Sequence, residues 1–443
     1  MSTKLTINRT NGNVPKTLQG EDHITGFVAY LPDTETPESF KTERVQALST
    51  IDAAEAAGIT ADAASWAVKV LHFHLSEIFR TNPAVSLYVG IFAKPSGASD
   101  AYTFAELKTV QNFAGGRIRQ MGVWCGDRNM SADDITTLQG IGDTLADQAA
   151  ELSILYAPKV ANVKQITQEA AGIGKSRVSV VIGQAGSGTG ATLYKDKDNA
   201  AKSSVSGLGT VLGLLSRAKV HQCIAWVREF PTGISVPAFG DGTLFRDLDK
   251  ALVEQLDKAR YLFFVTQPGQ TGSYLNDSHT MDEATSDYAA IESVRTMDKA
   301  VRGVRTYIVP ELGGNVYVDA ESGKLASYSV SHLENVANLA LEDMERAGEL
   351  SGYKAEIDPE QDVASTGRVD IVIKNVASPV IRHINIKKDR VCQNRITSKH
   401  KTNGKYNKQR HSFGQWHAMR LGRCGSPYRR RACNGHCRRG VWR

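Results

Sequence analysis

The chain has 443 residues, of which 41% are hydrophobic and 23% are charged, so it has room for two or three domains and a sizeable core. It contains no run of about 18 apolar residues, and its N-terminus lacks the apolar segment of a secretion signal, so we expect neither a membrane span nor export. The net charge of +6 is unevenly distributed. Residues 390–443 hold 15 of the 53 basic residues and no acidic one, which leaves 38 basic against 47 acidic residues, a net charge of −9, in residues 1–389.

Residues 62–265 alternate between helical and strand-like patterns. Apolar side chains recur every three or four positions in four segments, which predicts helices at 62–79, 103–113, 132–152 and 244–260. Short apolar runs lie at 85–92, 117–124, 154–156, 178–182, 223–227 and 261–265. Ser131 and Asp134 resemble a capping box at the start of the third helix. The alternation predicts an α/β fold in which helices cover a sheet.

Two glycine-rich segments resemble nucleotide-binding loops. Gly172–Ser176 ends like a phosphate-binding loop, but position 169 is Glu where that motif needs glycine, and a strand rather than a helix follows. Gly183–Gly190 follows a strand, but no obvious amphipathic helix comes after it, so we interpret it as a flexible turn. These loops leave a nucleotide-binding α/β enzyme as one alternative for the function of the chain.

Other chemistry-bearing side chains do not combine into a site. His72 and His74 are two positions apart in a predicted helix, so they point to different faces and cannot chelate one metal. Cys125 and Cys223 are isolated from any histidine that the sequence places nearby, and we interpret them as reduced thiols. We therefore predict a protein that is not an enzyme and has no catalytic residue, cofactor, metal or small-molecule substrate.

The segment from Asn276 to Asp389 has clear folding signals and no chemistry. A helix at 287–305, capped by Ser286 or Asp287, precedes strand-like runs at 306–310 and 315–319 and a turn at 320–324. A second helix places six apolar residues on one face and stops at Gly348: Leu333, Val336, Ala337, Ala340, Leu341 and Met344. Strands are predicted at 353–357 and 368–374, and Pro379 separates them from a last strand at 382–387.

The order of these elements resembles the C-terminal domain of contractile tail sheath proteins, which form the sheath of contractile phage tails and related injection machines. The likeness rests on Leu275–Asp277, the following helix, the Val318–Lys324 turn and the strands that close the segment. Gln19–Gly26 and the stretch from Gly207 to Val227 resemble one branch of the same family. The resemblance covers most of residues 15–389, and its strength lies in the order of the motifs rather than in any one of them.

The resemblance implies a structural protein of α/β class, with α+β character in its C-terminal domain, whose helices cover mixed sheets and whose terminal arms are extended. It implies an arm at 1–20, α/β sheath domains at 21–270 and a C-terminal domain at 271–389, while composition alone sets residues 390–443 apart as a basic tail. Expected partners are neighbouring sheath subunits in stacked hexameric rings, the inner tail tube, the baseplate and the tail terminator, with no membrane or nucleic acid. Expected localisation is the virion tail, assembled in the bacterial cytoplasm.

In such proteins terminal arms add strands to sheets of neighbouring subunits, and the C-terminal domain contacts the tube. Two groups of residues are therefore candidates for assembly contacts. The expected linking strand contains Ile381, His383, Ile384 and Ile386. The expected tube-facing residues, on the exposed side of the second helix, are Glu334, Glu342, Glu345 and Arg346.

Residues 390–443 differ from the rest of the chain in composition. They contain four of the six cysteines, Cys392, Cys424, Cys433 and Cys437, and two arginine clusters. A zinc site is one interpretation, although the Cys and His spacing matches no common finger, and a nucleic-acid-binding arm is another. We prefer a third hypothesis, a frameshifted or aberrant extension that lacks a fold, because apolar periodicity stops where the sheath pattern is complete.

Overall fold

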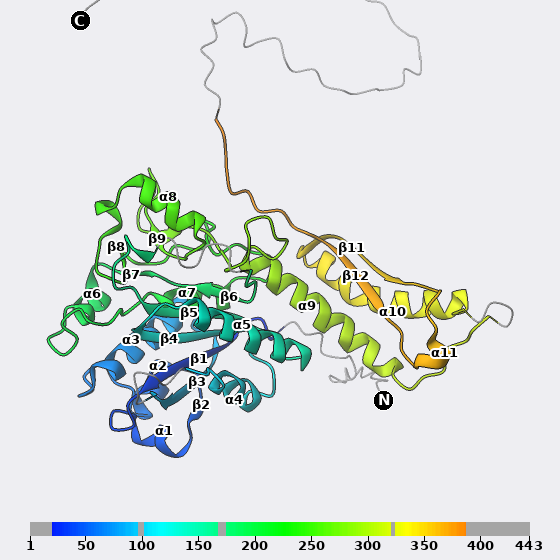
Figure 1. Ribbon diagram of the computed structural model, residues 1–443, viewed down its shortest axis with the longest axis horizontal. Coiled ribbons are helices and arrows are strands. Elements are labelled where there is room, and N and C mark those ends of the chain that lie inside the picture. The colour runs from blue at the N-terminus through cyan, green and yellow to red at the C-terminus, as the bar shows by residue number, and fades with distance from the viewer. Residues whose placement is uncertain (1–19, 96–101, 167–173, 320–323, 387–443) are drawn as a thin grey trace, which may run out of the picture. The chain divides into compact units, whose positions relative to one another are not determined.

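The computed structural model describes residues 20–95, 102–166, 174–319 and 324–386 (Figure 1). The chain divides into a unit spanning Met1–Arg382 and a second unit spanning His383–Arg443, and the account below concerns the first. The arm predicted before residue 20 and the basic tail beyond residue 389 lie outside the described residues. Among the helices described, none has both the length and the hydrophobicity needed to cross a bilayer.

The centre of the fold is a six-stranded sheet with the strand order β2-β3-β1-β4-β5-β6. The strands are β1 (Ile24–Leu31), β2 (Val45–Leu48), β3 (Ser86–Ala93), β4 (Gln120–Asn129), β5 (Ser153–Lys159) and β6 (Val178–Val180). All neighbouring pairs are parallel except β2 and β3. Strand β1 is buried along its whole length, which is typical of a parallel strand with helices on both faces.

Helices cover the sheet on both faces and define two hydrophobic cores. One core contains Phe27, Ala29 and Leu31 of β1 with α3 (Trp66–Thr81) and α7 (Leu208–Arg217). The other contains Val28 and Tyr30 with α4 (Glu106–Phe113) and α5 (Ala132–Asp147). Successive β1 side chains alternate between the two cores because neighbouring residues of a strand point to opposite faces. The α/β fold class predicted from the sequence is confirmed.

Two glycines set the distance between α3 and α7. A Cβ atom at Gly209 would lie 2.4 Å from the carbonyl oxygen of His74, and one at Gly213 would lie 2.7 Å from Cβ of Thr81. Only glycine permits this approach, so the backbones of the two helices pack directly against each other. The segment Gly207–Gly213, noted in the sequence for its family resemblance, therefore has a packing role.

Smaller elements connect the sheet to the rest of the unit. They are α1 (Glu38–Thr42), α2 (Ile51–Ala56), α6 (Gly188–Tyr194), α8 (Lys250–Lys258) and two short antiparallel pairs, β7 (Gly183–Ala185) with β8 (Pro237–Phe239) and β9 (Phe264–Val265) with β10 (Tyr274–Leu275). Helix α6 begins inside the segment Gly183–Gly190, so the prediction of a flexible turn there was wrong. The apolar run 223–227 forms turns, and the helix predicted at 244–260 is shorter.

The C-terminal part of the unit pairs two long helices with a hairpin. Helix α9 (Ile291–Ile308) packs against α10 (Ser327–Arg346), and β11 (Leu350–Ile357) pairs antiparallel with β12 (Ile371–Ala377). A single helical turn, α11 (Val363–Thr366), lies between the two strands. Their core is small and built around Ala300, Ala337, Leu341 and Met344. The second helix, its stop near Gly348 and both strands confirm the sequence prediction.

Two boundaries in this region differ from the prediction. Helix α9 begins four residues later than expected because Ala290 is extended and forms an antiparallel bridge with His279. The run 306–310, predicted as a strand, continues the helix to Ile308 and then forms a 3-10 turn at Val309–Glu311. Tyr307 and Ile308 pack against the helix-pair core, so tertiary contact overrides the local preference for a strand.

Candidate functional site

The segment after β12 leaves the fold without a strand partner. Residues 378–386 form no strand in the structure, so the strand predicted at 382–387 is wrong over its described part, and Lys387 lies outside the described residues. Ile381, Ile384 and Ile386 are 80%, 78% and 82% exposed, and His383 is also exposed. Three isoleucines in water are unusual unless a partner covers them. Their expected contact with a neighbouring subunit stays a prediction.

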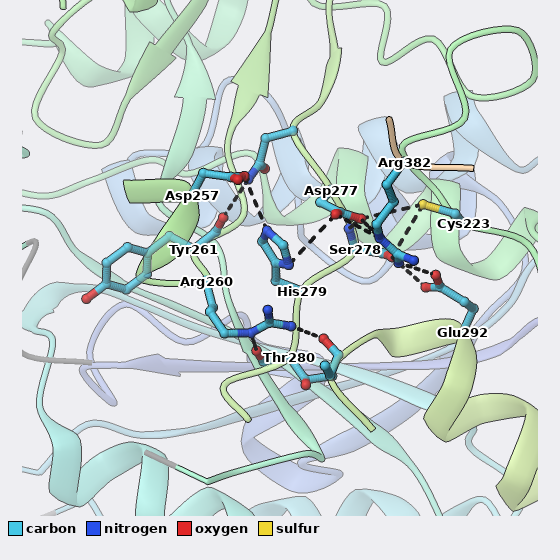
Figure 2. A network of polar contacts seen from close by, with 12 residues as sticks. Cys223, Asp257, Arg260, Tyr261, Asp277, Ser278, His279, Thr280, Glu292 and Arg382 are labelled. Atoms are coloured by element: carbon cyan, nitrogen blue, oxygen red, sulfur yellow. Dashed lines mark hydrogen bonds and ion pairs between the residues drawn. The ribbon is translucent and has the colours of Figure 1, made fainter. Parts of the chain in front are cut away.

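Arg382 fixes the start of this segment to the fold (Figure 2). Its Nε donates to both carboxylate oxygens of Asp277 at 2.9 and 3.1 Å, and its Nη2 donates to Glu292 Oε1 at 2.6 Å. The carboxylate side chains are 15% and 7% exposed, so the pairs are largely shielded from water. We call Arg382, Asp277 and Glu292 the arginine anchor. Ion pairs with good hydrogen-bond geometry and low exposure to water fix the orientation of the paired side chains as well as the distance between them.

Further hydrogen bonds hold the two carboxylates of the anchor in place. Ser278 N donates to Asp277 Oδ1 at 2.8 Å, and Ser278 Oγ donates to Glu292 Oε2 at 2.5 Å. Ile291 N, at the start of α9, donates to Ser278 O at 2.9 Å. The loop after β10 and the first turn of α9 are thereby joined behind the anchor, and Arg382 docks on a surface that is already organised.

A second layer supports the same loop (Figure 2). His279 Nε2 lies 3.2 Å from Asp257 Oδ1, and Asn276 Nδ2 donates to the same oxygen at 2.9 Å. Arg260 Nε donates to Thr280 O at 2.9 Å, and its Nη2 donates to the carbonyl of Ala289. Because α8 supplies Asp257 and the turn after it supplies Arg260, the anchor rests on the body of the fold.

Electrostatics favour the charged state of the anchor. Burial alone would lower the pKa of Arg382, but the charges of Asp277 and Glu292 and the hydrogen bonds to them raise it above its ordinary value. Burial and the charge of Glu292 raise the pKa of Cys223 to about 11, so this thiol is protonated at neutral pH. Its Sγ lies 3.4 Å from Ser278 Oγ, where it acts as a packing and hydrogen-bonding group.

The four candidate tube contacts on α10 do not share one environment. Glu345 and Arg346 are exposed, while Glu342 is half-buried and pairs with Arg346. Glu334 is half-buried, and its Oε1 accepts a hydrogen bond from Ile357 N of β11 at 2.9 Å. The expectation that Glu334 lies on the exposed side of the helix was wrong, because its carboxylate satisfies a backbone donor of the hairpin.

Helix α9 joins the body through a second set of charges, which we call the α9 junction. Lys299 Nζ lies 2.9 Å from Asp22 Oδ2 and 2.7 Å from Glu349 Oε1, and Arg177 pairs with Asp298 at 3.0 Å. Arg305 pairs with Glu151 at 2.5 Å. Sequence reasoning missed this junction. The available signal was the pair Glu21–Asp22 inside the segment Gln19–Gly26, immediately before the buried β1.

His72 and His74, which the sequence predicts cannot bind one metal together, have separate surroundings. His74 is fully buried between α3 and α7, where its Nδ1 accepts from Gly209 N at 3.3 Å, while His72 Nε2 lies 2.9 Å from Glu55 Oε1. Within the described residues no group of three or more His, Cys, Asp and Glu side chains is arranged to hold a metal. The two histidines confirm the prediction that they point to different faces.

A pocket of about 680 Å³ opens where the carboxyl ends of β1 and β4 meet, the usual ligand position in such sheets. Its charged lining is mainly acidic: Glu35, Asp127 and Asp198, with Lys94 paired to Asp127. Carboxylates at this position repel phosphate groups. Gly190, from the glycine-rich segment, packs closely against Phe73 and Ala185. These observations do not support the nucleotide-binding alternative.

Comparisons with known proteins agree with this geometry. The family model described as the DUF2586 N-terminal domain matches residues 3–279, and the one described as the DUF2586 C-terminal domain matches residues 287–395. A protein of Haemophilus phage HP1 (strain HP1c1) named "Putative tail sheath protein" is 28% identical over 168 residues. That alignment covers 36% of this chain and 43% of the relative, so the chain matches less than half the relative's length.

Two solved structures share the fold. One, from the baseplate of the anti-feeding prophage, has a TM-score of 0.57 and 13% identity, and the alignment covers 88% of this chain and all of the other. The second is the PVC sheath complex of an extracellular contractile injection system in its contracted state, with a TM-score of 0.56 and 12% identity. This alignment covers 89% of this chain and 99% of the other. The resemblance to contractile tail sheath proteins predicted from the sequence is confirmed.

Proposed function

The chain belongs to the DUF2586 family, and we propose that it is a tail sheath subunit of a contractile injection machine. Copies of the chain polymerise into stacked hexameric rings around an inner tube, and contraction of the rings drives the tube through the envelope of the target cell. The observation that carries the proposal is the fold shared with a contractile injection system sheath over 89% of this chain. Energy stored in subunit packing powers the motion, so the protein is not an enzyme and needs no cofactor.

The proposed linkage between subunits runs through the terminal segments. Residues 21–270 form the α/β sheath domains, residues 271–389 form the C-terminal domain, and residues 1–20 form the N-terminal arm. The exposed Ile381, Ile384 and Ile386 support this view because they follow one another closely in the sequence around Arg382, in a stretch (378–386) that forms no strand. Added as a strand to a neighbour's sheet, such a segment gains main-chain hydrogen bonds and covers its isoleucines.

The proposed partners are neighbouring sheath subunits, the inner tail tube, the baseplate and the tail terminator. Contact with the tube is assigned to the exposed end of α10, where Glu345 and Arg346 reach solvent and Glu342 supports Arg346. Glu334 contributes indirectly by holding β11. The proposed location is the tail of the particle, assembled in the bacterial cytoplasm.

Electron microscopy of the full chain, expressed alone and together with an inner tube protein, tests the proposal. We expect rings or tubes of regular pitch. A protein that stays monomeric under both conditions and binds ATP or NAD tightly would overturn the proposal in favour of the enzyme alternative.

Deletion variants test the role of the arms. Removal of residues 379–389, or of residues 1–16, should block polymerisation and leave the circular dichroism of the subunit nearly unchanged, because these segments serve a neighbour. A subunit that loses its fold on deletion would mean that the segments pair within their own chain.

A further inference from the structure

The connection between α9 and α10 carries an exposed apolar surface, which we call the apolar tip. Its members are large apolar residues, each at least 44% exposed, that lie just after α9, in the loop that follows and in the first turn of α10: Val309, Leu312, Tyr317, Val318 and Tyr328. The rings of Tyr317 and Tyr328 lie 5.3 Å apart. Apolar side chains gathered in this way mark a contact with another molecule.

Hydrogen bonds hold the backbone of the tip in one conformation. Tyr317 N donates to Ser329 Oγ at 3.1 Å, and Ala326 N donates to Tyr317 O at 2.9 Å. His332 Nε2 lies 3.1 Å from Glu311 Oε2, which joins the end of α9 to the first turns of α10. A surface with a fixed backbone loses little conformational entropy when a partner binds to it.

A second exposed apolar set begins at the opposite end of α9. Among the described residues, the four large apolar side chains with the greatest exposure are Leu312 in the tip and the three isoleucines Ile381, Ile384 and Ile386. Arg382 fixes the chain beside Glu292, in the first turn of α9, whereas the tip follows the last turn. Because α9 has 18 residues, its two ends are about 25 Å apart.

The isoleucines after Arg382 cannot reach the tip of their own chain while the arginine anchor holds. Ile386 lies four residues beyond Arg382, and four extended residues span at most about 14 Å, well short of the length of α9. In an extended strand Ile384 and Ile386 project to the same face, about 7 Å apart. The rings of Tyr317 and Tyr328 have a comparable separation of 5.3 Å. Two different surfaces at opposite ends of one subunit join copies head to tail, which builds rings or open helices.

We propose that the apolar tip receives Ile384 and Ile386 of a second copy of this chain. The inference rests on the proposed sheath function and names the surface on which the linking segment docks. The tip adjoins the β11–β12 hairpin, because Ile357 and Ile371 of the hairpin share a small core with Leu325. A strand that pairs with that end of the hairpin places its side chains beside the tip.

Variants of the full chain that disable one surface at a time test the inference. The tip variant carries Leu312→Ser with Tyr328→Ser, and the segment variant carries Ile384→Ser with Ile386→Ser. Each should raise the protein concentration needed for polymerisation by at least about tenfold, because the apolar area buried in the contact is lost. Phe113→Ser, which removes a side chain of 55% exposure from α4, is the control and should polymerise like wild type.

A mixture of the two variants gives a sharper readout. The tip variant keeps an intact segment and the segment variant keeps an intact tip, so one contact forms between them and growth then stops. At a concentration where wild type polymerises, sedimentation velocity should show a 1:1 dimer in the mixture and monomers in each variant alone. A mixture that stays monomeric, or a tip variant that polymerises like wild type, would overturn the proposal.

The same experiments separate this inference from the sheath function. Wild type that forms no polymer overturns both. A tip variant that polymerises normally but no longer encloses an inner tube overturns the inference alone, because the tip would then contact the tube rather than a second copy. A control variant that loses polymer as strongly as the tip variant also counts against the inference, since the loss would not be specific to the tip.

Discussion

The body and the C-terminal helices of this protein are stabilised in different ways. The body buries a six-stranded sheet between two large apolar cores, and β1 at its centre has no exposed residue. The C-terminal region has two small cores and leaves large apolar side chains in water, including Leu312, Tyr317, Tyr328 and Val376. It is tied to the body by the charges of the α9 junction. The body therefore buries most of its apolar surface within itself, whereas the C-terminal region keeps apolar surface exposed that partners could cover.

The largest expected effect tests whether the body is the stable part. Phe27→Ala should lower the free energy of unfolding by about 3–5 kcal/mol, because Phe27 is fully buried in the central strand and a cavity would remain. Urea denaturation followed by circular dichroism measures this loss. Leu341→Ala, in the small C-terminal core, is the matched variant. We expect it to unfold α10 locally, so that limited proteolysis cuts α10 while the body stays resistant. Equal cleavage of both regions by the protease would mean that the body is not the more stable of the two.

The α9 junction should be the next most sensitive point. Lys299→Met leaves the carboxylates of Asp22 and Glu349 without their shared cation in a largely buried site, and we expect a loss of about 2–3 kcal/mol. Lys374→Met is the control, since Lys374 is 61% exposed and solvent screens its pair with Glu356, so we expect a much smaller loss than for Lys299→Met. Similar losses for both, measured in urea, would mean that the junction does not hold the two regions together.

Stability of the body should also depend on pH through His74. Burial lowers the pKa of His74 to about 3, below the value of about 6.5 in an unfolded chain, so only the unfolded state takes up a proton between these values. Stability is then fully present above pH 6.5 and falls by roughly 1.4 kcal/mol for each unit below it. His74→Gln should flatten this slope relative to wild type, which urea denaturation above and below pH 6.5 would measure.

The smallest effect on stability, but a large one on assembly, is expected at the arginine anchor. Arg382→Met should cost about 1 kcal/mol, less than Lys299→Met, because Arg382 is 36% exposed and Lys299 only 13%, so water reaches the carboxylates of the anchor once the arginine is gone. The substitution also frees the start of the segment that carries the exposed isoleucines. Sedimentation and electron microscopy should show reduced polymer, while the Tm of the subunit falls by no more than about 4 °C. Arg368→Met, which loses an exposed pair with Asp370, is the control. Normal polymer from Arg382→Met would remove the anchor from the assembly mechanism.

The pattern of the sequence predicted the long amphipathic elements well. The helix with Leu333, Ala337 and Leu341 on one face is α10, and the alternating run at Val369, Ile371 and Ile373 leads into β12. Strand β1 gave no usable signal, since ITGFVAYL is buried on both faces and shows no alternation. The run 306–310 has strand-forming residues, but its side chains pack on α10 as part of a helix.

The candidate site was only partly predictable. The sequence named Ile381, Ile384 and Ile386 as part of a linking strand; in the structure they are exposed but form no strand, and their contact with a neighbour stays a prediction. The pairing of Arg382 with Asp277 and Glu292 did not follow, because these residues are 105 and 90 positions apart from it. Charges carry no periodicity, and an isolated charged residue has many partners within reach of an unfolded chain. Pairing of this kind is decided by the packing of the elements that carry the charges.

The sequence by itself determined the α/β class and the long helices, because apolar spacing and turn residues act locally. Tertiary structure alone decided the strand order, the close contact of α3 and α7 through Gly209, and the charges that tie α9 to the body. It also decided where Arg382 docks. The physical reason is that burial and ion pairing depend on distances in space, which neighbouring residues in the chain do not specify.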